Sequence, residues 1–409
     1  MLVVPDVHEM FVPLLDGCLV SARESSAVID SLVEQIPTLF GDTRETETVL
    51  GSAIQAGLDA LKAAECSGKL FVFHTTLPIA DAPGKLKNRD DRKLLGTDKE
   101  KSLLTPQTPF YSQLGQECVG AGCCVDLFLF HNAYIDVATI GQVAKMTGGQ
   151  VYKYTYFQAG ADGNCFLEDL RRDVSKPIAL LYTSCSGQRR LRVLNLALAV
   201  CSQMADLYRN CDLDTLINCL SKQAVRHLVE SGGGPRQVKE GSLSRAAQML
   251  ASYRKHCAAP SSSGQLILPE SMKLLPLYIY CVLKSDAISG GAELTTDDRS
   301  FAMLSLVSMD VSSTVAYFYP RLLPLHEGDS EELPVALRCT VEKIQDNGVY
   351  LLENGIHMFL WIGMAVEPGF LQDVFAQPVP ARVDIQKGSL LELNTPASRR
   401  VRSIIERVR

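Results

Sequence analysis

The sequence predicts a multidomain chain in which α/β parts flank an all-helical part. Three observations lead to this prediction. Within residues 1–173, apolar runs typical of buried strands alternate with helical patterns. Within residues 200–298, apolar residues recur at helical three-and-four spacing, and from residue 299 strand-like and helical patterns alternate again. A chain of 409 residues also exceeds one ordinary core, so about two to four domains are expected.

The bulk composition excludes several classes of protein. The net charge of −6 gives no signal for nucleic-acid binding. The longest apolar runs are about ten residues, roughly half of the ~20 that a transmembrane helix needs. The start MLVVPDVHEM lacks the pattern of a secretory signal. The 13 cysteines contain no CxxC spacing, which weakens both a zinc site and a disulfide framework, so we expect reduced and mostly buried thiols.

Residues 1–173 are expected to form a parallel-rich sheet covered on both faces by helices. Helical patterns cover Glu24–Ile36, which Pro37 ends, and Thr46–Ala64. Strands are predicted at Leu2–Val4, Lys69–Thr75, Cys123–Phe130 and Gly149–Phe157.

The segment Leu77–Leu103 joins two of these strands and is rich in cations. It has two interpretations: a solvated loop, or a basic surface that binds anionic lipid or a partner. Acidic residues interleaved with the cations reduce the net positive electrostatic field of such a surface. The membrane-facing hypothesis rests on Lys85, Lys87, Arg89, Arg92 and Lys93.

Residues 174–199 predict a β-hairpin. Its apolar run Ile178–Tyr182 and its arginine-rich run are separated by the polar turn Ser184–Gln188. Two strands alone are marginally stable, so they require a sheet from elsewhere. Cations beside an apolar slot suit an acidic-plus-aliphatic peptide signal, and the alternative is an ordinary solvated strand face. The candidate signal-binding residues are Leu180, Tyr182, Arg189, Arg190 and Arg192.

Residues 200–298 predict a helical domain. Asp212 or Asp214 is placed to cap a helix that runs toward Leu220. Gly232–Pro235 breaks the first group of helices, and Arg245–Arg254 is amphipathic. Two short helices, split at Pro269 and Pro276, are expected within Leu266–Leu283.

Residues 299–409 return to an α/β pattern. Thr314–Leu325 is predicted to be an edge strand, because its prolines cannot donate the hydrogen bonds that a central strand needs. Gly348–Gly363 reads as a hairpin with Asn-Gly in its turn, and Ser398–Val408 as a basic amphipathic helix.

Catalytic motifs are missing: the sequence has no P-loop, GxGxxG, HExxH or GxSxG. Asp310–Thr314, DVSST, is similar to the DxSxS cation loop of von Willebrand A-type domains. Because it follows a helix-like pattern rather than a buried strand, a helix-ending turn is the favoured interpretation over a metal site. No catalytic residue and no metal ligand is predicted.

Many segments of the sequence resemble, in order, the cargo-selecting adaptor subunit of the COPII vesicle inner coat, closest to its vertebrate C/D-type paralogues. The resemblance runs through almost the whole chain and rests on Asp6–Leu15, Asp42–Thr48, Leu77–Leu95, Cys123–Phe130, Thr147–Tyr154, Gly187–Leu196, Ala205–Asn218, Ser261–Tyr278, Thr295–Arg299, Phe318–Leu325 and Val349–Gly363.

The resemblance implies an architecture. Residues 1–173 would be the C-terminal part of a von Willebrand A-like trunk, 174–199 a β-sandwich remnant, 200–298 the helical domain and 299–409 a gelsolin-like domain. It further implies a non-enzymatic cytoplasmic coat protein, peripheral on endoplasmic-reticulum exit sites and COPII vesicles. Expected partners are the GTPase-activating inner-coat subunit, the small GTPase of the coat, the outer cage, and export signals of transmembrane cargo and SNAREs.

The chain departs from the family pattern in several places. The family's zinc-ribbon site, the first half of its trunk and its closing helical segment have no counterpart, so no cofactor is expected. Only Asp173–Pro177 stands where most of the β-sandwich would lie. Three alternatives stay open: the GTPase-activating sister subunit, a non-functional fragment or variant of the adaptor, and a small-molecule enzyme.

Overall fold

The computed structural model describes residues 4, 6–12, 18–176, 181–183, 189–191, 195–197, 200–230, 233–258, 264–265, 267–290, 293–328, 332–384 and 390–408. The chain divides into two compact units. Unit 1 comprises Met1–Phe157, Lys176–Leu198 and Gly291–Leu304. Unit 2 comprises Gln158–Ser175, Ala199–Gly290 and Ser305–Arg409. The units therefore cut across the boundary that we expected at residue 298.

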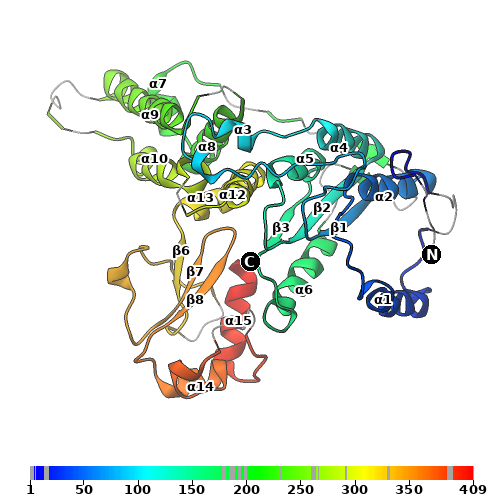
Figure 1. Cartoon of the computed structure of the whole chain (residues 1–409). Helices are drawn as coiled ribbons and strands as arrows, with labels where there is room; N and C mark the ends of the chain where they lie inside the picture. The colour runs from blue at the N-terminus through cyan, green and yellow to red at the C-terminus, as the bar shows by residue number, and fades with distance from the viewer. Residues whose placement is uncertain are drawn as a thin grey trace. The chain divides into compact units, whose positions relative to one another are not determined.

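Unit 1 is built on a parallel three-stranded sheet in the order β1-β2-β3, which confirms the parallel prediction (Figure 1). The strands are β1 (Gly68–His74), β2 (Cys123–Phe130) and β3 (Val151–Tyr154). Three helices bury their apolar stripes with residues of β2 in one core: α2 (Gly51–Ala63), α4 (Phe110–Ala121) and α5 (Val137–Thr147). Between β1 and α4 lie a 3₁₀ turn at Arg92–Leu94 and the short helix α3 (Lys101–Leu104).

The alternate residues of the sheet form rows of stacked rings. Phe73, Phe128 and Tyr152 are register neighbours, with ring centroids 5.2 and 4.6 Å apart. Strand β2 is buried through Leu129, as predicted, but the side chain of Phe73 is 53% exposed. Among the described residues, coverage of both faces therefore holds for β2 and not for the whole of β1.

Helix α1 (Ser26–Phe40) begins and ends later than predicted, and Pro37 lies inside it. The carbonyl of Pro37 still accepts the N–H of Gly41, so the helix continues for one turn past the proline. The expectation that Pro37 ends the helix was wrong. Its apolar residues, including Val28 and Leu32, are exposed. Most of the strand expected at Leu2–Val4 lies outside the described residues.

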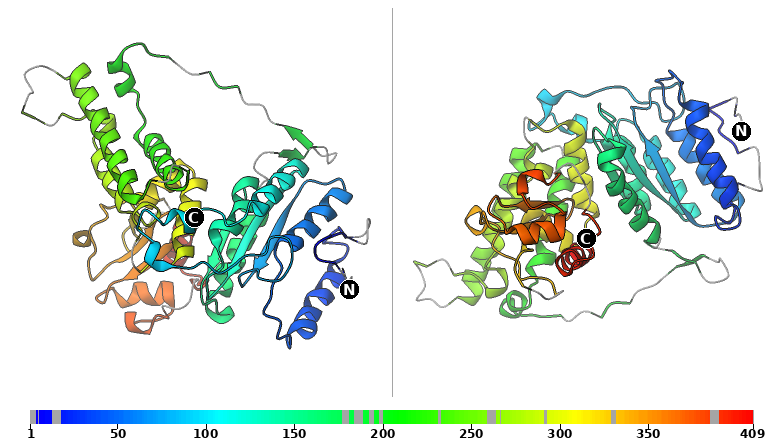
Figure 2. Two further views of the ribbon diagram at one scale, coloured as in Figure 1. Left: turned by 45° about the horizontal axis from the view of Figure 1, so that its top comes forward. Right: turned by 90° about the horizontal axis from the view of Figure 1, so that it is seen from below.

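The hairpin of residues 174–199 is described only in part. Strands β4 (Leu181–Thr183) and β5 (Arg189–Leu191) pair antiparallel, as predicted (Figure 2). They form a two-stranded sheet, and no third strand joins it within the described part of the chain.

Unit 2 begins with α6 (Ala159–Ser175) and continues as a group of helices. Asp212 caps α8 by accepting the N–H of Thr215 at 2.9 Å, as predicted. Pro235 starts α9, which confirms the break before it. Pro276 lies in the first turn of α10 instead of splitting it, because a proline needs no N–H partner there. The helices of unit 2 that follow are α7 (Met204–Arg209), α8 (Leu213–Glu230), α9 (Pro235–Cys257), α10 (Leu275–Lys284), α11 (Asp286–Ser289) and α13 (Val311–Phe318), with a 3₁₀ turn at Glu270–Met272. Helix α12 (Thr296–Ser308) lies mostly in unit 1, because that unit includes residues through Leu304.

Helix α13 corrects two predictions. We expected a strand from Thr314, but the chain is helical through Phe318, and only β6 (Arg321–Pro324) is extended. Asp310 starts this helix, because its carboxylate accepts the N–H of Ser313 at 2.7 Å. The DVSST segment is therefore an N-cap that follows α12, and the β-branched residues after it adopt the helix that the cap begins.

The C-terminal part of unit 2 contains an antiparallel sheet in the order β6-β7-β8, with β7 (Val349–Glu353) and β8 (Met358–Ile362). This confirms the predicted hairpin. Its turn uses Gly355 at φ 79°, a conformation that favours glycine. Helices α14 (Pro368–Phe375) and α15 (Pro396–Val408) pack on one side of this sheet, and 3₁₀ turns occur at Val341–Lys343 and Pro380–Arg382. The C-terminal helix is as predicted.

Candidate functional site

Two of the five predicted signal-binding residues fall outside the described part of the chain. Leu180 and Arg192 are not described. Tyr182, Arg189 and Arg190 lie in the hairpin, where the backbone register sets Tyr182 opposite Arg190. This part of the prediction stays a prediction.

The cation-rich segment between β1 and α4 is well described and has little regular structure. Leu86, Leu103 and Leu104 anchor it, because all three are buried. Four of its five candidate cations are exposed: Lys85, Lys87, Arg92 and Lys93. We call this segment, residues 77–105, the basic loop.

Arg89 does not belong to the exposed surface of the basic loop. It forms a two-pronged ion pair with Asp136, from Nε at 3.0 Å and from Nη2 at 2.9 Å. It also donates to the carbonyls of Ser102 and Thr105, each at 2.7 Å. Burial opposes its charge, but the hydrogen bonds and charge of Asp136 outweigh this and raise the pKa of Arg89. The expectation that Arg89 faces a membrane was wrong, because its charge is used inside unit 1.

Asp136 explains why an arginine is held there. It is fully buried, precedes α5 at φ 60°, and accepts the N–H of Thr139 at 3.2 Å. A buried carboxylate needs a cation, and a guanidinium can satisfy both of its oxygens. Sequence reasoning missed this pairing, since 47 residues separate the two partners.

A second set of contacts joins the basic loop to the start of α12. Thr296 donates to Asp90 at 2.6 Å. Arg299 donates to Glu100 at 3.0 Å, with side-chain exposures of 0% and 3%. In the sequence, Thr295–Arg299 is distinguished only by the family resemblance. Its contacts with the loop are not predictable there, because nothing local in the sequence indicates partners about 200 residues away.

The same short segment contacts the start of α5 and the end of β3. Asp297 accepts the N–H groups of Ile135 at 2.7 Å and Val137 at 2.8 Å. Burial raises the pKa of Asp297 to about 6, although these two hydrogen bonds oppose the shift. Asp298 pairs with Lys153. All these partners belong to unit 1.

Two buried histidines lie at the carboxyl ends of neighbouring strands: His74 is the last residue of β1, and His131 directly follows β2. Burial lowers the pKa of His74 to about 4, and burial also lowers the pKa of His131. His131 Nδ1 lies 2.9 Å from the carbonyl oxygen of Ala133, the distance of a hydrogen bond that a neutral ring can donate. Both rings are therefore neutral at pH 7.

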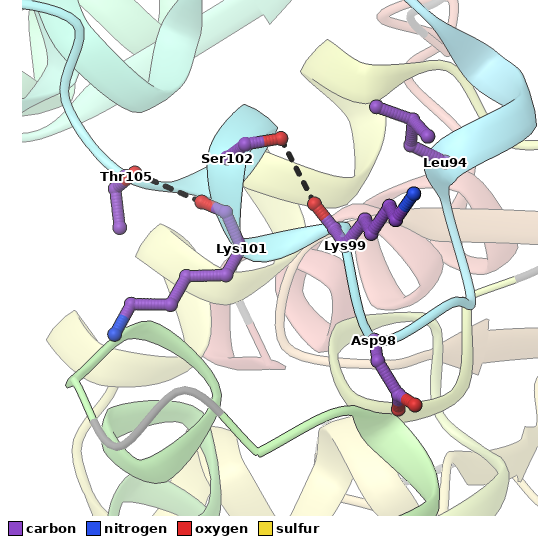
Figure 3. Close-up of a pocket in the computed structure, with 6 residues that line it drawn as sticks. All are labelled: Leu94, Asp98, Lys99, Lys101, Ser102 and Thr105. Carbon is purple, nitrogen blue, oxygen red and sulfur yellow. Dashed lines mark hydrogen bonds between the residues drawn. The ribbon is translucent and has the colours of Figure 1, made fainter.

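A shallow hollow lies on the basic loop (Figure 3). Ser102 Oγ donates to the carbonyl of Lys99 at 2.9 Å, and Thr105 Oγ1 to that of Lys101 at 2.8 Å. The ammonium groups of these two lysines point in different directions in Figure 3. Because it is open and lined by Leu94, Asp98, Lys99, Lys101, Ser102 and Thr105, it suits a contact surface better than an enclosed substrate site.

Within the described residues, no cluster of three or more His, Cys, Asp or Glu could hold a metal ion. None of the described helices has the length and apolarity to cross a bilayer. Of the described cysteines, only Cys118, Cys123 and Cys124 are buried, so the expectation of mostly buried thiols was wrong.

Comparison with known proteins agrees with this architecture. Three family models match in order: "Sec23/Sec24 trunk domain" over residues 1–174, "Sec23/Sec24 helical domain" over 212–316 and "Gelsolin repeat" over 330–405. The helical match extends past our expected boundary at residue 298, in agreement with helices α12 and α13.

Individual relatives support the same family. Human protein transport protein Sec24C is 49% identical over 473 aligned positions, which cover all of this chain and 43% of that protein. Human Sec24D is 42% identical and covers 99% of this chain and 45% of that protein. The crystal structure of the human COPII-coat protein Sec24c superposes with a TM-score of 0.87 at 48% identity, covering 100% of this chain and 63% of that one.

The chain thus spans less than half the length of these curated relatives. Its three domain types nevertheless occur in the family's order, and the identity holds over the whole chain. The chain belongs to the Sec24 family.

Proposed function

We propose that the chain acts as a coat adaptor in vesicle transport from the endoplasmic reticulum to the Golgi, binding export signals in the cytosolic segments of transmembrane cargo and SNAREs. The observation that carries the proposal is the 49% identity to a Sec24 protein through trunk, helical and gelsolin-like parts. The relatives reported above bear Sec24 names, which favours the adaptor over its GTPase-activating sister subunit. The adaptor has no catalytic role and needs no cofactor in this chain.

The adaptor pairs with the GTPase-activating inner-coat subunit and, through it, with the small GTPase and the outer cage. Its place is cytoplasmic, at the membrane of exit sites and coated vesicles. Four exposed cations of the basic loop, Lys85, Lys87, Arg92 and Lys93, support a contact with anionic lipid, because a cation near such a surface contributes about 1 kcal/mol. Lys85 and Arg92 also lie near Asp81 and Asp90, at 3.3 and 3.8 Å, so Lys87 and Lys93 are expected to contribute more.

The first test is co-purification of this chain with the GTPase-activating inner-coat subunit, followed by size-exclusion chromatography. A stable one-to-one complex is expected. Separate elution of two well-folded proteins would contradict the adaptor proposal for this chain.

The signal-binding residues are tested separately. Arg190→Glu combined with Arg192→Glu should weaken binding of an acidic export peptide at least about tenfold, since charge-assisted contacts are lost. The control is Arg226→Glu with Arg236→Glu, two exposed arginines of unit 2 in local helix pairs. Equal peptide affinity in both variants would remove the hairpin from the proposed site while leaving the complex with the partner subunit intact.

A further inference from the structure

The basic loop is held at two of its acidic residues by the start of α12. Asp90 accepts a hydrogen bond from Thr296, and Glu100 pairs with Arg299. We call residues 295–299 the strap. Both ends of this contact lie within unit 1, although about 200 residues of chain separate them.

Glu100 transmits the strap contact to the backbone of the basic loop. One of its oxygens accepts from Arg299, and the other accepts the N–H of Gly96 at 2.7 Å. Gly96 has φ 76°, so the chain turns sharply there. The buried ion pair therefore fixes the turn that precedes Lys99 and Lys101.

The strap and the basic loop also share an anchor at the start of α5. Asp136 there holds Arg89 of the loop, and the N–H groups of Ile135 and Val137 hold Asp297 of the strap. Lys153 adds an ion pair to Asp298. Loop and strap thus converge on one helix terminus through side chains that are largely buried.

The backbone hydrogen bonds within the loop are mostly local turns, such as those from Thr97 N–H to the Leu94 carbonyl and from Leu103 N–H to the Glu100 carbonyl, and such bonds do not tie the loop to the rest of unit 1. Its described regular elements are one 3₁₀ turn and the four-residue helix α3. A loop of this kind adopts one conformation only where side-chain contacts outweigh its conformational entropy. The buried partners of Asp90 and Glu100 supply such contacts.

We propose that the strap is a positioning device that holds the basic loop in the conformation that presents its exposed cations to an anionic lipid surface. This inference rests on the membrane contact proposed above. Arg299 and Thr296 act as positioning residues: they touch the loop, and the cations Lys87, Lys93 and Lys99 touch the lipid. A loop released from the strap loses more conformational entropy when it binds the lipid surface, so its affinity for that surface falls.

The test measures two quantities on the full chain. The first is binding to vesicles of phosphatidylcholine with phosphatidylserine and phosphatidylinositol, compared with phosphatidylcholine alone, at several salt concentrations. The second is amide hydrogen exchange of residues 88–104, with β1 and β2 of the same unit as a folding reference. Arg299→Met should accelerate exchange in the loop by about tenfold or more and weaken anionic-vesicle binding several-fold, while the reference strands stay unchanged.

Three further variants separate the possible causes. Lys93→Glu with Lys99→Glu should abolish anionic-vesicle binding without changing exchange in the loop. Glu100→Gln with Arg299→Gln should restore both readings in part, because a neutral pair replaces an unpaired buried carboxylate. Lys145→Glu, an exposed residue of α5, is the matched charge-reversal control and should bind like the parent chain.

The outcomes distinguish the inference from the proposed function. If the parent chain does not bind anionic vesicles, the proposed membrane contact is disproved, and the positioning role that rests on it is disproved as well. If the parent chain binds and Arg299→Met changes neither binding nor exchange, the strap is overturned while the membrane contact stands. Should Arg299→Met disturb β1 and β2 as well, Thr296→Val replaces it, and unchanged loop exchange in that variant would overturn the strap.

Discussion

At the scale of single residues, unit 1 depends on charges that the fold has removed from water. Arg89 and Asp136 form a pair in which the carboxylate is completely buried. A buried pair of this kind adds little net stability over apolar side chains, but removing one partner is costly because the other charge stays behind.

Arg89→Met should therefore destabilise unit 1 by roughly 3 kcal/mol, since Asp136 loses the cation that pairs with it while it remains buried. Arg92→Met is the control, because Arg92 is largely exposed and should cost below about 0.5 kcal/mol. The measurement is urea unfolding followed by hydrogen exchange at β2. Equal costs in the two variants would show that the ion pair does not hold the loop.

His74 should make unit 1 sensitive to acid. Its folded-state pKa is lowered from 6.5 to about 4, mainly by burial, so the unfolded chain binds the proton more tightly. Stability from the neutral ring is present above pH 6.5 and is lost as the pH falls toward 4, by about 2 kcal/mol between pH 7 and pH 5. Asp297 acts in the opposite direction: its raised pKa means that stability is lost as the pH rises through about 6.

The effect of His74 is isolated by comparing unfolding free energies at pH 7 and pH 5. In His74→Gln, acidification should cost about 2 kcal/mol less than in the parent chain. His227→Gln, in unit 2, should leave the difference as it is. An identical pH response in parent and His74→Gln would mean that the His74 ring is protonated in the folded state without penalty.

At the scale of elements, the sequence was most informative where the periodicity was long or the turn chemistry specific. The buried run of β2 and the Asn-Gly turn after β7 were predicted correctly, because each depends on residues that lie next to one another. Helix α13 was mistaken for a strand, because its Val, Tyr and Phe residues favour strands and the Asp310 cap was read as the end of a helix. The predicted end of helix α1 was too early, because a proline is expected to end a helix and Pro37 lies inside this one.

The cap of α13 can be tested directly. Asp310→Ala should destabilise the helical part of unit 2 by about 1 kcal/mol, because the N–H of Ser313 loses its acceptor. Ser312→Ala, an exposed neighbour within the helix, should be close to neutral. Hydrogen exchange at residues 313–316 is the appropriate readout, and unchanged protection in Asp310→Ala would argue against the cap.

The candidate site was only partly predictable for a related reason. The cation count of the basic loop was visible in its composition, and four of five named residues are exposed. Arg89 is withdrawn from the surface because it pairs with Asp136. Asp90 and Glu100 are fixed because they contact Thr296 and Arg299. Such pairs are set by tertiary proximity, which neither spacing nor periodicity encodes.

At the scale of the whole molecule, the boundary of unit 1 does not follow the order of the sequence. Residues 291–304 belong to unit 1, although residues 199–290 before them belong to unit 2. A domain division at the end of the trunk match, residue 174, would therefore separate Glu100 from Arg299.

A chain ending at residue 290 should consequently show faster amide exchange in β1, β2 and the basic loop than a chain ending at residue 308. Both chains lack β6, β7 and β8, so they differ only in α12 and the segment before it. Equal protection in the two would show that unit 1 is complete without residues 291–304.

Because Arg299 lies far from Glu100 in the sequence, their ion pair can form only late in protein synthesis. Glu100 emerges from the ribosome 199 residues before its partner, which at ~5–20 residues per second is an interval of about 10 to 40 seconds. During that interval the nascent trunk carries a carboxylate without its cation and a loop without its strap. Any pause in translation before residue 299 would lengthen the interval in which Glu100 lacks this partner.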